Sequence, residues 1–87
     1  MASFTLSHEA DQDIISIYLY TLQHFGQLQA DKYHDALEAQ FNCLAEKPHL
    51  GVVIDMQLGG GFRALYQSHT IYYRQSAEGI VIRRILH

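Results

Sequence analysis

Four arginines are the residues of this 87-residue chain with the clearest potential for chemistry, and all lie in its last third. They are Arg63, Arg74, Arg83 and Arg84. A guanidinium group binds phosphate or carboxylate through two parallel hydrogen bonds. Such groups could neutralise the reacting phosphate of an RNA, or they could contact an acidic partner. RNA cleavage would also need a base for the 2′-hydroxyl and an acid for the leaving oxygen.

Histidine and cysteine are the other candidates for chemistry. The spacing of the histidines gives no His-x-x-His or helical i, i+4 pair, and a single cysteine cannot complete a zinc site. The histidines and the cysteine concerned are His8, His24, His34, His49, His69, His87 and Cys43. The run Gly59-Gly60-Gly61 lacks the Gly-Lys-Ser/Thr sequel of a phosphate loop and indicates a flexible connection. We therefore expect neither a metal nor another cofactor.

The charge balance is mildly acidic, with six cations against nine carboxylates and a net charge of -3. Proteins that bind nucleic acid need clustered cations, because release of counterions from the phosphates supplies much of the affinity. The six cations are dispersed along this sequence. We therefore expect a protein partner and no direct contact with nucleic acid.

The length predicts one domain over residues 1–87. An apolar fraction of 48% with 17% charged residues argues against disorder. The N-terminus has no basic region followed by an apolar run, and no stretch approaches the length of a membrane span. With Cys43 alone, no internal disulfide can form, so we expect a cytoplasmic protein in which Cys43 is a small buried hydrophobe.

The first half of the chain predicts a short strand and two helices. Residues 3–6 alternate polar and apolar, as a strand with one buried side does. Ser7 can cap a helix over 8–25, whose apolar stripe runs from Ala10 to Phe25 at steps of three and four, and Gly26 suits the position just after its end. A second helix over 28–46 ends before Pro48. The short break predicts an antiparallel αα-hairpin.

The second half predicts a loop and then strands. Residues 48–61 are expected to form a loop, with Val52, Val53 and Ile54 tucked against the body. Strands are predicted over 62–66, 69–74 and 80–86, which are rich in β-branched and aromatic residues. The result is an α+β fold of the order strand-helix-helix-strand-strand-strand. The hairpin would cover one face of an antiparallel sheet.

Particular residues at the joints of these elements resemble the ParE/RelE toxin superfamily. The similarity extends over nearly the whole chain, and it lies in the order and spacing of the segments Leu6-Ser7 with Ala10 and Asp13-Ile14, Tyr20-Thr21 with Phe25-Gly26 and Gln29-Ala30, Leu44-Ala45-Glu46 with Pro48 and Gly51, Gly61 with Arg63, Ser68-His69 with Ile71-Tyr72-Tyr73-Arg74, and Ile82-Arg83-Arg84-Ile85-Leu86-His87. The Tyr-Thr…Phe-Gly helix end and the closing Arg-Ile-Leu-His favour the ParE branch.

The resemblance implies the toxin of a type II toxin–antitoxin pair. Toxins of the ParE branch inhibit DNA gyrase by binding it, and a small, acidic, partly disordered antitoxin neutralises them. The alternative is a RelE-type endonuclease that cuts mRNA in the ribosome. Such a site would add lysines in the sheet, whereas Lys32 and Lys47 lie on or beside the helical hairpin. Family members usually continue past the closing histidine, and a non-toxic remnant that binds its antitoxin is a third possibility.

We expect Arg63, Arg83, Arg84 and His87 to contact a partner and none of them to be catalytic. Arg83 and Arg84 are neighbours on a predicted strand, so their side chains should point to opposite faces of the sheet. One should face solvent or a partner, and the other should pair with a carboxylate of a helix. Arg63 follows three glycines that allow a sharp turn of the backbone.

Overall fold

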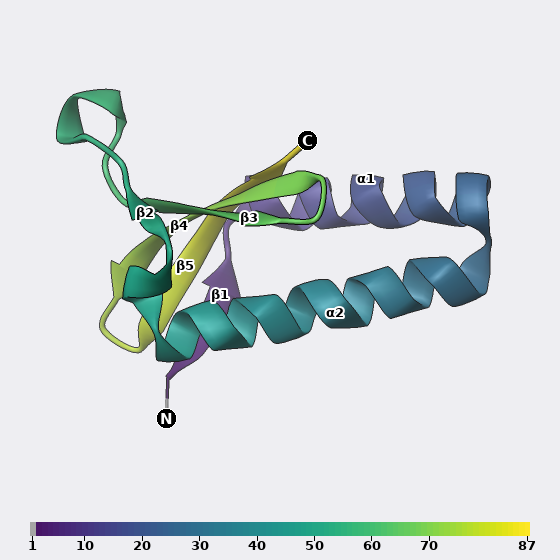
Figure 1. The fold of residues 1–87 in the computed structure, drawn as a ribbon, viewed down its shortest axis with the longest axis horizontal. Coiled ribbons are helices and arrows are strands. Elements are labelled where there is room, and N and C mark those ends of the chain that lie inside the picture. The colour runs from purple at the N-terminus through teal and green to yellow at the C-terminus, as the bar shows by residue number, and fades with distance from the viewer. Residues whose placement is uncertain (1) are drawn as a thin grey trace.

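The computed structural model describes residues 2–87 as two helices packed on one face of a five-stranded sheet (Figure 1). Its elements, in chain order, are strand β1 (Ser3–Leu6), helices α1 (His8–Phe25) and α2 (Gln27–Glu46), a 3-10 turn at Pro48–Leu50, strand β2 (Val52–Val53), a 3-10 turn at Met56–Leu58, and strands β3 (Phe62–Tyr66), β4 (His69–Ser76) and β5 (Gly79–Leu86). The predicted α+β class and the helical hairpin are confirmed.

Helix α1 begins and ends where its cap residues predict. The Ser7 hydroxyl accepts a hydrogen bond from the Ala10 N–H at 3.0 Å and so satisfies a free donor of the first turn of α1. Gly26, with φ of +89°, ends α1 and lets the chain reverse directly into α2. Helix α2 begins at Gln27, one residue earlier than expected.

The sheet is mixed, and the prediction of an antiparallel sheet was wrong for one strand. Its order is β1-β5-β4-β3-β2, and β1 runs parallel to β5 while the other pairs are antiparallel. Parallel neighbours need a long connection, and here it comprises both helices and the three middle strands. The alternation of apolar residues in β1 carries no information about the direction of its partner.

The segment Val52–Val53 also departs from expectation. These residues form the edge strand β2, paired with Phe62 and Arg63 of β3, and are not tucked against the body. Their side chains are 57% and 70% exposed. A two-residue strand has too short a pattern to be told from a loop by periodicity.

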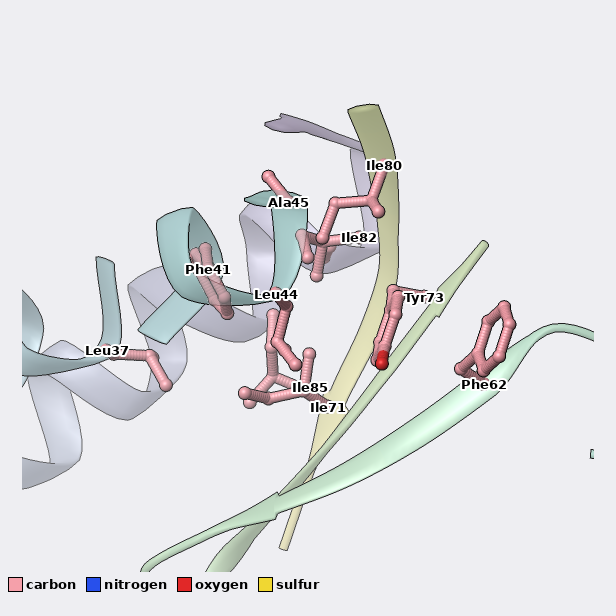
Figure 2. Packing of buried hydrophobic residues seen from close by; sticks show 11 residues of the cluster. Leu37, Phe41, Leu44, Ala45, Phe62, Ile71, Tyr73, Ile80, Ile82 and Ile85 are labelled. Carbon is pink, nitrogen blue, oxygen red and sulfur yellow. The ribbon is translucent and has the colours of Figure 1, made fainter. Parts of the chain in front are cut away.

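The core lies between α2 and the covered face of the sheet. Figure 2 shows Phe41 and Leu44 of α2 facing Ile71, Ile82 and the other buried strand residues. Each of these four side chains is at most 2% exposed. Burial of one such side chain contributes about 1.5–3 kcal/mol. The hairpin is therefore fixed to the sheet mainly by apolar packing.

Two predictions of burial on the hairpin were wrong. Cys43 is exposed, because it lies on α2 beside the buried stripe and not within it. Phe25, predicted to belong to the apolar stripe of α1, is 67% exposed. The reason is visible in Figure 1, where the closed end of the hairpin extends past the sheet. No helix of the described residues is long and apolar enough to cross a membrane.

The parallel pairing of β1 with β5 should depend on Gly79. This residue has φ of +152°, and a Cβ placed on it would collide with the backbone carbonyl oxygen of Ser3, its partner in β1. We expect Gly79→Ala to lower the free energy of unfolding by more than about 2 kcal/mol, because strain of the backbone is added to displacement of a strand. Urea unfolding followed by circular dichroism measures this.

Gly59→Ala is the matched control. Gly59 also has positive φ, at +111°, but no atom beyond its chain neighbours lies within 4 Å of the added Cβ. Its substitution should cost only the strain of a left-handed residue, about 1–2 kcal/mol. Equal destabilisation by the two substitutions would contradict the role given to the close approach of β1.

Candidate functional site

The uncovered face of the sheet carries the arginines of the chain. Along β3 and β4 the buried residues Phe62, Ile71 and Tyr73 alternate with exposed ones, and this alternation puts Arg63 and Arg74 on the side away from the helices. Both could have been placed there from the period of two in the sequence.

Arg83 and Arg84 both lie on the uncovered face, so the prediction that they point to opposite faces was wrong. The register between β4 and β5 shifts at this point: Tyr73 is opposite Ile82, whereas Tyr72 is opposite Arg84. Arg83 is thus the extra residue of a β-bulge, which resets the alternation of side chains. Both arginines line one groove of the uncovered face.

Asp13 of α1 fixes Arg84 in place. Its carboxylate accepts hydrogen bonds from Arg84 Nε at 2.8 Å and Arg84 Nη2 at 3.0 Å, and a third from the Ile85 N–H at 2.9 Å. The bond from Arg84 is the main reason that the pKa of Asp13 lies below its ordinary value; partial burial opposes the shift and the Ile85 N–H adds to it. The expected pairing of one arginine with a helix carboxylate is confirmed.

The other three arginines have no carboxylate partner among residues 2–87 within 4.0 Å. Arg74 donates instead to the carbonyl oxygen of Gly59, at 3.0 Å, in the loop between β2 and β3. Arg63 and Arg83 are exposed and line an open groove of about 370 Å³ beside this loop. We call the surface formed by Arg63, Arg74, Arg83 and Arg84 the arginine face.

Opposite charges are therefore segregated in space. Residues 62–87 hold all four arginines against one carboxylate, Glu78, which gives a net charge of +3. Residues 1–61 hold two lysines against eight carboxylates, which gives −6. Seven of those eight carboxylates lie on α1 and α2. The premise that the cations are dispersed was wrong, because three strands bring the arginines together. Cations clustered on one face are compatible with contact to nucleic acid.

A second, larger groove lies on the other side of the sheet, where the hairpin overhangs it. Its volume is about 870 Å³, and we call it the hairpin groove. It is lined by Ser16, Ile17, Tyr20, Thr21, Phe25, Gln29, Tyr33, Gln67, Ser68, His69 and His87. None of these described residues is an aspartate, glutamate, lysine or arginine. The surface of the groove is mainly apolar, although most of its lining residues carry a polar group.

The polar groups of the hairpin groove gather around His69. Its Nδ1 is 2.7 Å from the Tyr33 hydroxyl, and its ring lies 5.5 Å from that of His87. Burial, and to a lesser degree the neighbouring His87, lowers the pKa of His69. Burial likewise raises the pKa of Tyr33. Both shifts favour the uncharged forms of His69 and Tyr33.

The four residues predicted to contact a partner divide between the two surfaces. Arg63, Arg83 and Arg84 belong to the arginine face, whereas His87 lines the hairpin groove. Sequence reasoning missed the role of Asp13 and the groove itself. A carboxylate in the second turn of α1 gives no sign of which strand it meets. The groove arises from the overhang of the hairpin, which depends on the angle between helix and sheet.

A family model described as "ParE toxin of type II toxin-antitoxin system, parDE" matches residues 4–87. The chain belongs to the ParE toxin family. This membership confirms the resemblance to the ParE branch and covers every element of the fold from β1 to β5.

Relatives of this ParE-family protein include Toxin ParE1 of Caulobacter vibrioides, 32% identical over 87 residues, an alignment that covers 100% of this chain and 90% of the relative. Toxin ParE1 of Mycobacterium tuberculosis (H37Rv) is 31% identical over 86 residues, covering 97% and 87%. A solved structure titled "Chromosomal ParDE TA system from P. aeruginosa" superposes with a TM-score of 0.81 at 20% identity, covering 100% of this chain and 96% of that one. This structural likeness shows that the fold is shared.

The Asp13 contact predicts a specific response to acid. Because the pKa of Asp13 is lowered in the folded state, its stabilisation is present above the ordinary value of 3.8 and is lost as pH falls through the folded-state pKa. Asp13→Asn should therefore melt a few degrees below wild type at pH 7, and the difference should narrow below about pH 4. Thermal melts across pH 2–7 measure it; Glu38→Gln, at an exposed position of α2, is the control. A difference that stays constant with pH would contradict this prediction.

Proposed function

We propose that this protein is the toxin of a type II toxin–antitoxin pair, that it inhibits DNA gyrase by binding and not by catalysis, and that a cognate antitoxin neutralises it. Membership of the ParE family supports the proposal. The positions of the arginines and histidines also support it, because an RNA-cleaving site needs both kinds of group together, whereas a binding surface does not.

The arginines and the imidazoles lie on opposite sides of the sheet. RNA cleavage needs cations on the scissile phosphate together with a base and an acid within hydrogen-bond reach of the reacting oxygens. The arginine-face groove is lined by Arg63, Arg83 and Arg84 but by no histidine or carboxylate of the described residues. His69 and His87 line the hairpin groove instead. This separation favours binding over ribonuclease activity.

We assign the target contact to the arginine face. Arg63 and Arg83 are exposed cations without a carboxylate partner among residues 2–87, and Tyr72 lies between Arg63 and Arg84 in the strand register. Arginine and tyrosine are enriched among the residues that dominate protein interfaces. Because Asp13 already holds Arg84, binding there costs little side-chain entropy at this residue.

We assign the antitoxin to the hairpin groove. A small, partly disordered partner can fold an amphipathic helix into an apolar groove of this kind. Tyr20 and Phe25, which are 60% and 67% exposed, offer large apolar surfaces at its outer wall. His87 and His69 offer hydrogen-bonding positions on the sheet side.

The gyrase proposal is tested by comparing two activities of one protein preparation. We expect inhibition of supercoiling by purified gyrase and no ribosome-dependent cleavage of mRNA. Arg63→Ala/Arg83→Ala should weaken inhibition by at least tenfold, because it removes two free cations of the contact surface. Lys32→Ala/Lys47→Ala removes the same charge from the hairpin side and should leave inhibition within twofold. Cleavage of mRNA with unaffected supercoiling would overturn the proposal.

The antitoxin proposal is tested by substitution in the groove wall. Phe25→Ser should weaken binding of the cognate antitoxin by at least tenfold with little loss of stability, because the side chain is already mostly exposed. Leu28→Ser is the control, since Leu28 is 85% exposed but does not line the groove. Isothermal titration calorimetry measures both. Equal affinities of the two variants would place the antitoxin elsewhere.

A further inference from the structure

We infer that the arginine face binds the phosphate backbone of duplex DNA, so that the toxin contacts DNA directly when it engages its target. This inference deepens the proposed function and rests on it for the choice of duplex DNA, the substrate of the proposed target enzyme. The inference names the molecule that the arginines bind, whereas the proposed function requires only that the arginines lie at the interface with the target.

The first support is the electrostatic polarity of the molecule. The strands β3, β4 and β5 carry four arginines and no carboxylate, while seven carboxylates lie on the helices behind them. A protein of this polarity is turned by the field of a polyanion so that its cationic side approaches first. A net charge of -3 does not prevent this, because screening over about 8–10 Å weakens the repulsion from the far side.

The second support is the arrangement of the guanidinium groups. Arg63 and Arg84 lie in one row across the sheet, with Tyr72 between them. Their Cα atoms are thus about two strand spacings apart, roughly 9–10 Å. Arg74 lies two residues further along β4 from Tyr72, about 7 Å away. The cations therefore spread over an area large enough for several phosphates, and Arg63 and Arg83, which have no carboxylate partner among residues 2–87, can each bind one in bidentate fashion.

The third support is the loop between β2 and β3, which projects beyond the sheet (Figure 1). Its Met56 and Leu58 are 85% and 80% exposed. The loop is nonetheless ordered by hydrogen bonds: Asp55 accepts from Gln57 N through its side chain and from Leu58 N through its backbone. Arg74 joins it to the arginine face through Gly59.

An exposed apolar tip beside cations matches one known mode of DNA binding. Proteins that bend DNA place arginines on the phosphates and insert methionine or leucine between base steps. An acidic polypeptide could also pair with the arginines. However, a segment lying in the groove of about 370 Å³ would leave Met56, which is outside that groove, in water. A duplex, whose major groove alone is about 12 Å wide, is broad enough to contact the arginine-lined groove and Met56 together.

The salt dependence of binding follows from the number of free cations. Three arginines without carboxylate partners should release about three counterions, which gives a slope of about −2.7 for log affinity against log salt. Affinity for duplex DNA should therefore fall about 40-fold between 50 and 200 mM salt. With only about three phosphate contacts, the isolated toxin should bind DNA weakly. A second contact that holds the toxin near DNA would strengthen this binding by raising the effective concentration.

The test is fluorescence anisotropy of the full chain with a labelled 20-base-pair duplex at 50 and 200 mM KCl. We expect saturable binding at 50 mM KCl. Arg63→Ala/Arg83→Ala should bind at least tenfold more weakly, with a salt slope smaller by about 2. Lys32→Ala/Lys47→Ala, which changes the net charge equally, should stay within twofold. Met56→Ser/Leu58→Ser should lower affinity and leave the slope unchanged, because it removes no cation.

Two further probes identify the class of ligand. A single-stranded RNA of the same length and a peptide of alternating glutamate and leucine should both bind more weakly than the duplex. Tighter binding of either probe overturns the inference, as does absence of duplex binding at 50 mM KCl or an equal loss in the lysine variant. A melting curve of each variant confirms folding, and Arg63 and Arg83 were chosen because neither has a carboxylate partner among residues 2–87.

The supercoiling assay separates failure of this inference from failure of the proposed function. Inhibition of gyrase by a toxin that does not bind DNA would overturn the inference and leave the proposed function intact. DNA binding without any effect on gyrase would support the arginine face as a phosphate site and remove the proposed target.

Discussion

The helical hairpin covers one face of the sheet and leaves the other in solvent, because the chain supplies two helices and both pack on the same side. An apolar sheet face must be buried, so isoleucine, phenylalanine and tyrosine occupy the covered side. The uncovered side has no such requirement and can carry charge. Side chains alternate along β3 and β4, so Arg63 and Arg74, each next to a core residue, face outward. The positions of these two arginines on the arginine face are thus a direct consequence of the core.

The ends of β1 and the bulge in β5 then set the details of that face. β1 pairs with β5 only from Ser3 to Leu6. Beyond that point the Ser7 hydroxyl donates a hydrogen bond to the Arg83 carbonyl oxygen at 2.8 Å, and the Asp13 carboxylate accepts one from the Ile85 N–H. Helix α1 thereby replaces the missing strand along the edge of β5. The same contacts hold the bulge that turns both Arg83 and Arg84 outward.

Local patterns in the sequence predicted the elements well, and pairing between distant elements is where prediction failed. Ser7 and Gly26 mark the bounds of α1 by their own backbone and side-chain chemistry, so they could be read directly. The parallel direction of β1 could not, because direction depends on a partner more than seventy residues away. The bulge likewise requires knowledge of the register with β4. Arg63 and Arg74 could be oriented from periodicity alone, whereas Arg84 could not.

Helix α1 takes part in both proposed binding surfaces. Asp13, in its second turn, holds Arg84 on the arginine face, while Tyr20 and Phe25, near its end, line the hairpin groove. A helix is stiff along its axis, so these two regions cannot move independently. Ile17 and Thr21 of α1 also line the groove, and the sheet side of the groove is formed by His69 and His87. A partner that seats against α1 in the groove and tilts it would therefore strain the contact between Asp13 and Arg84. The two surfaces lie on opposite faces of the sheet, yet they share one rigid element.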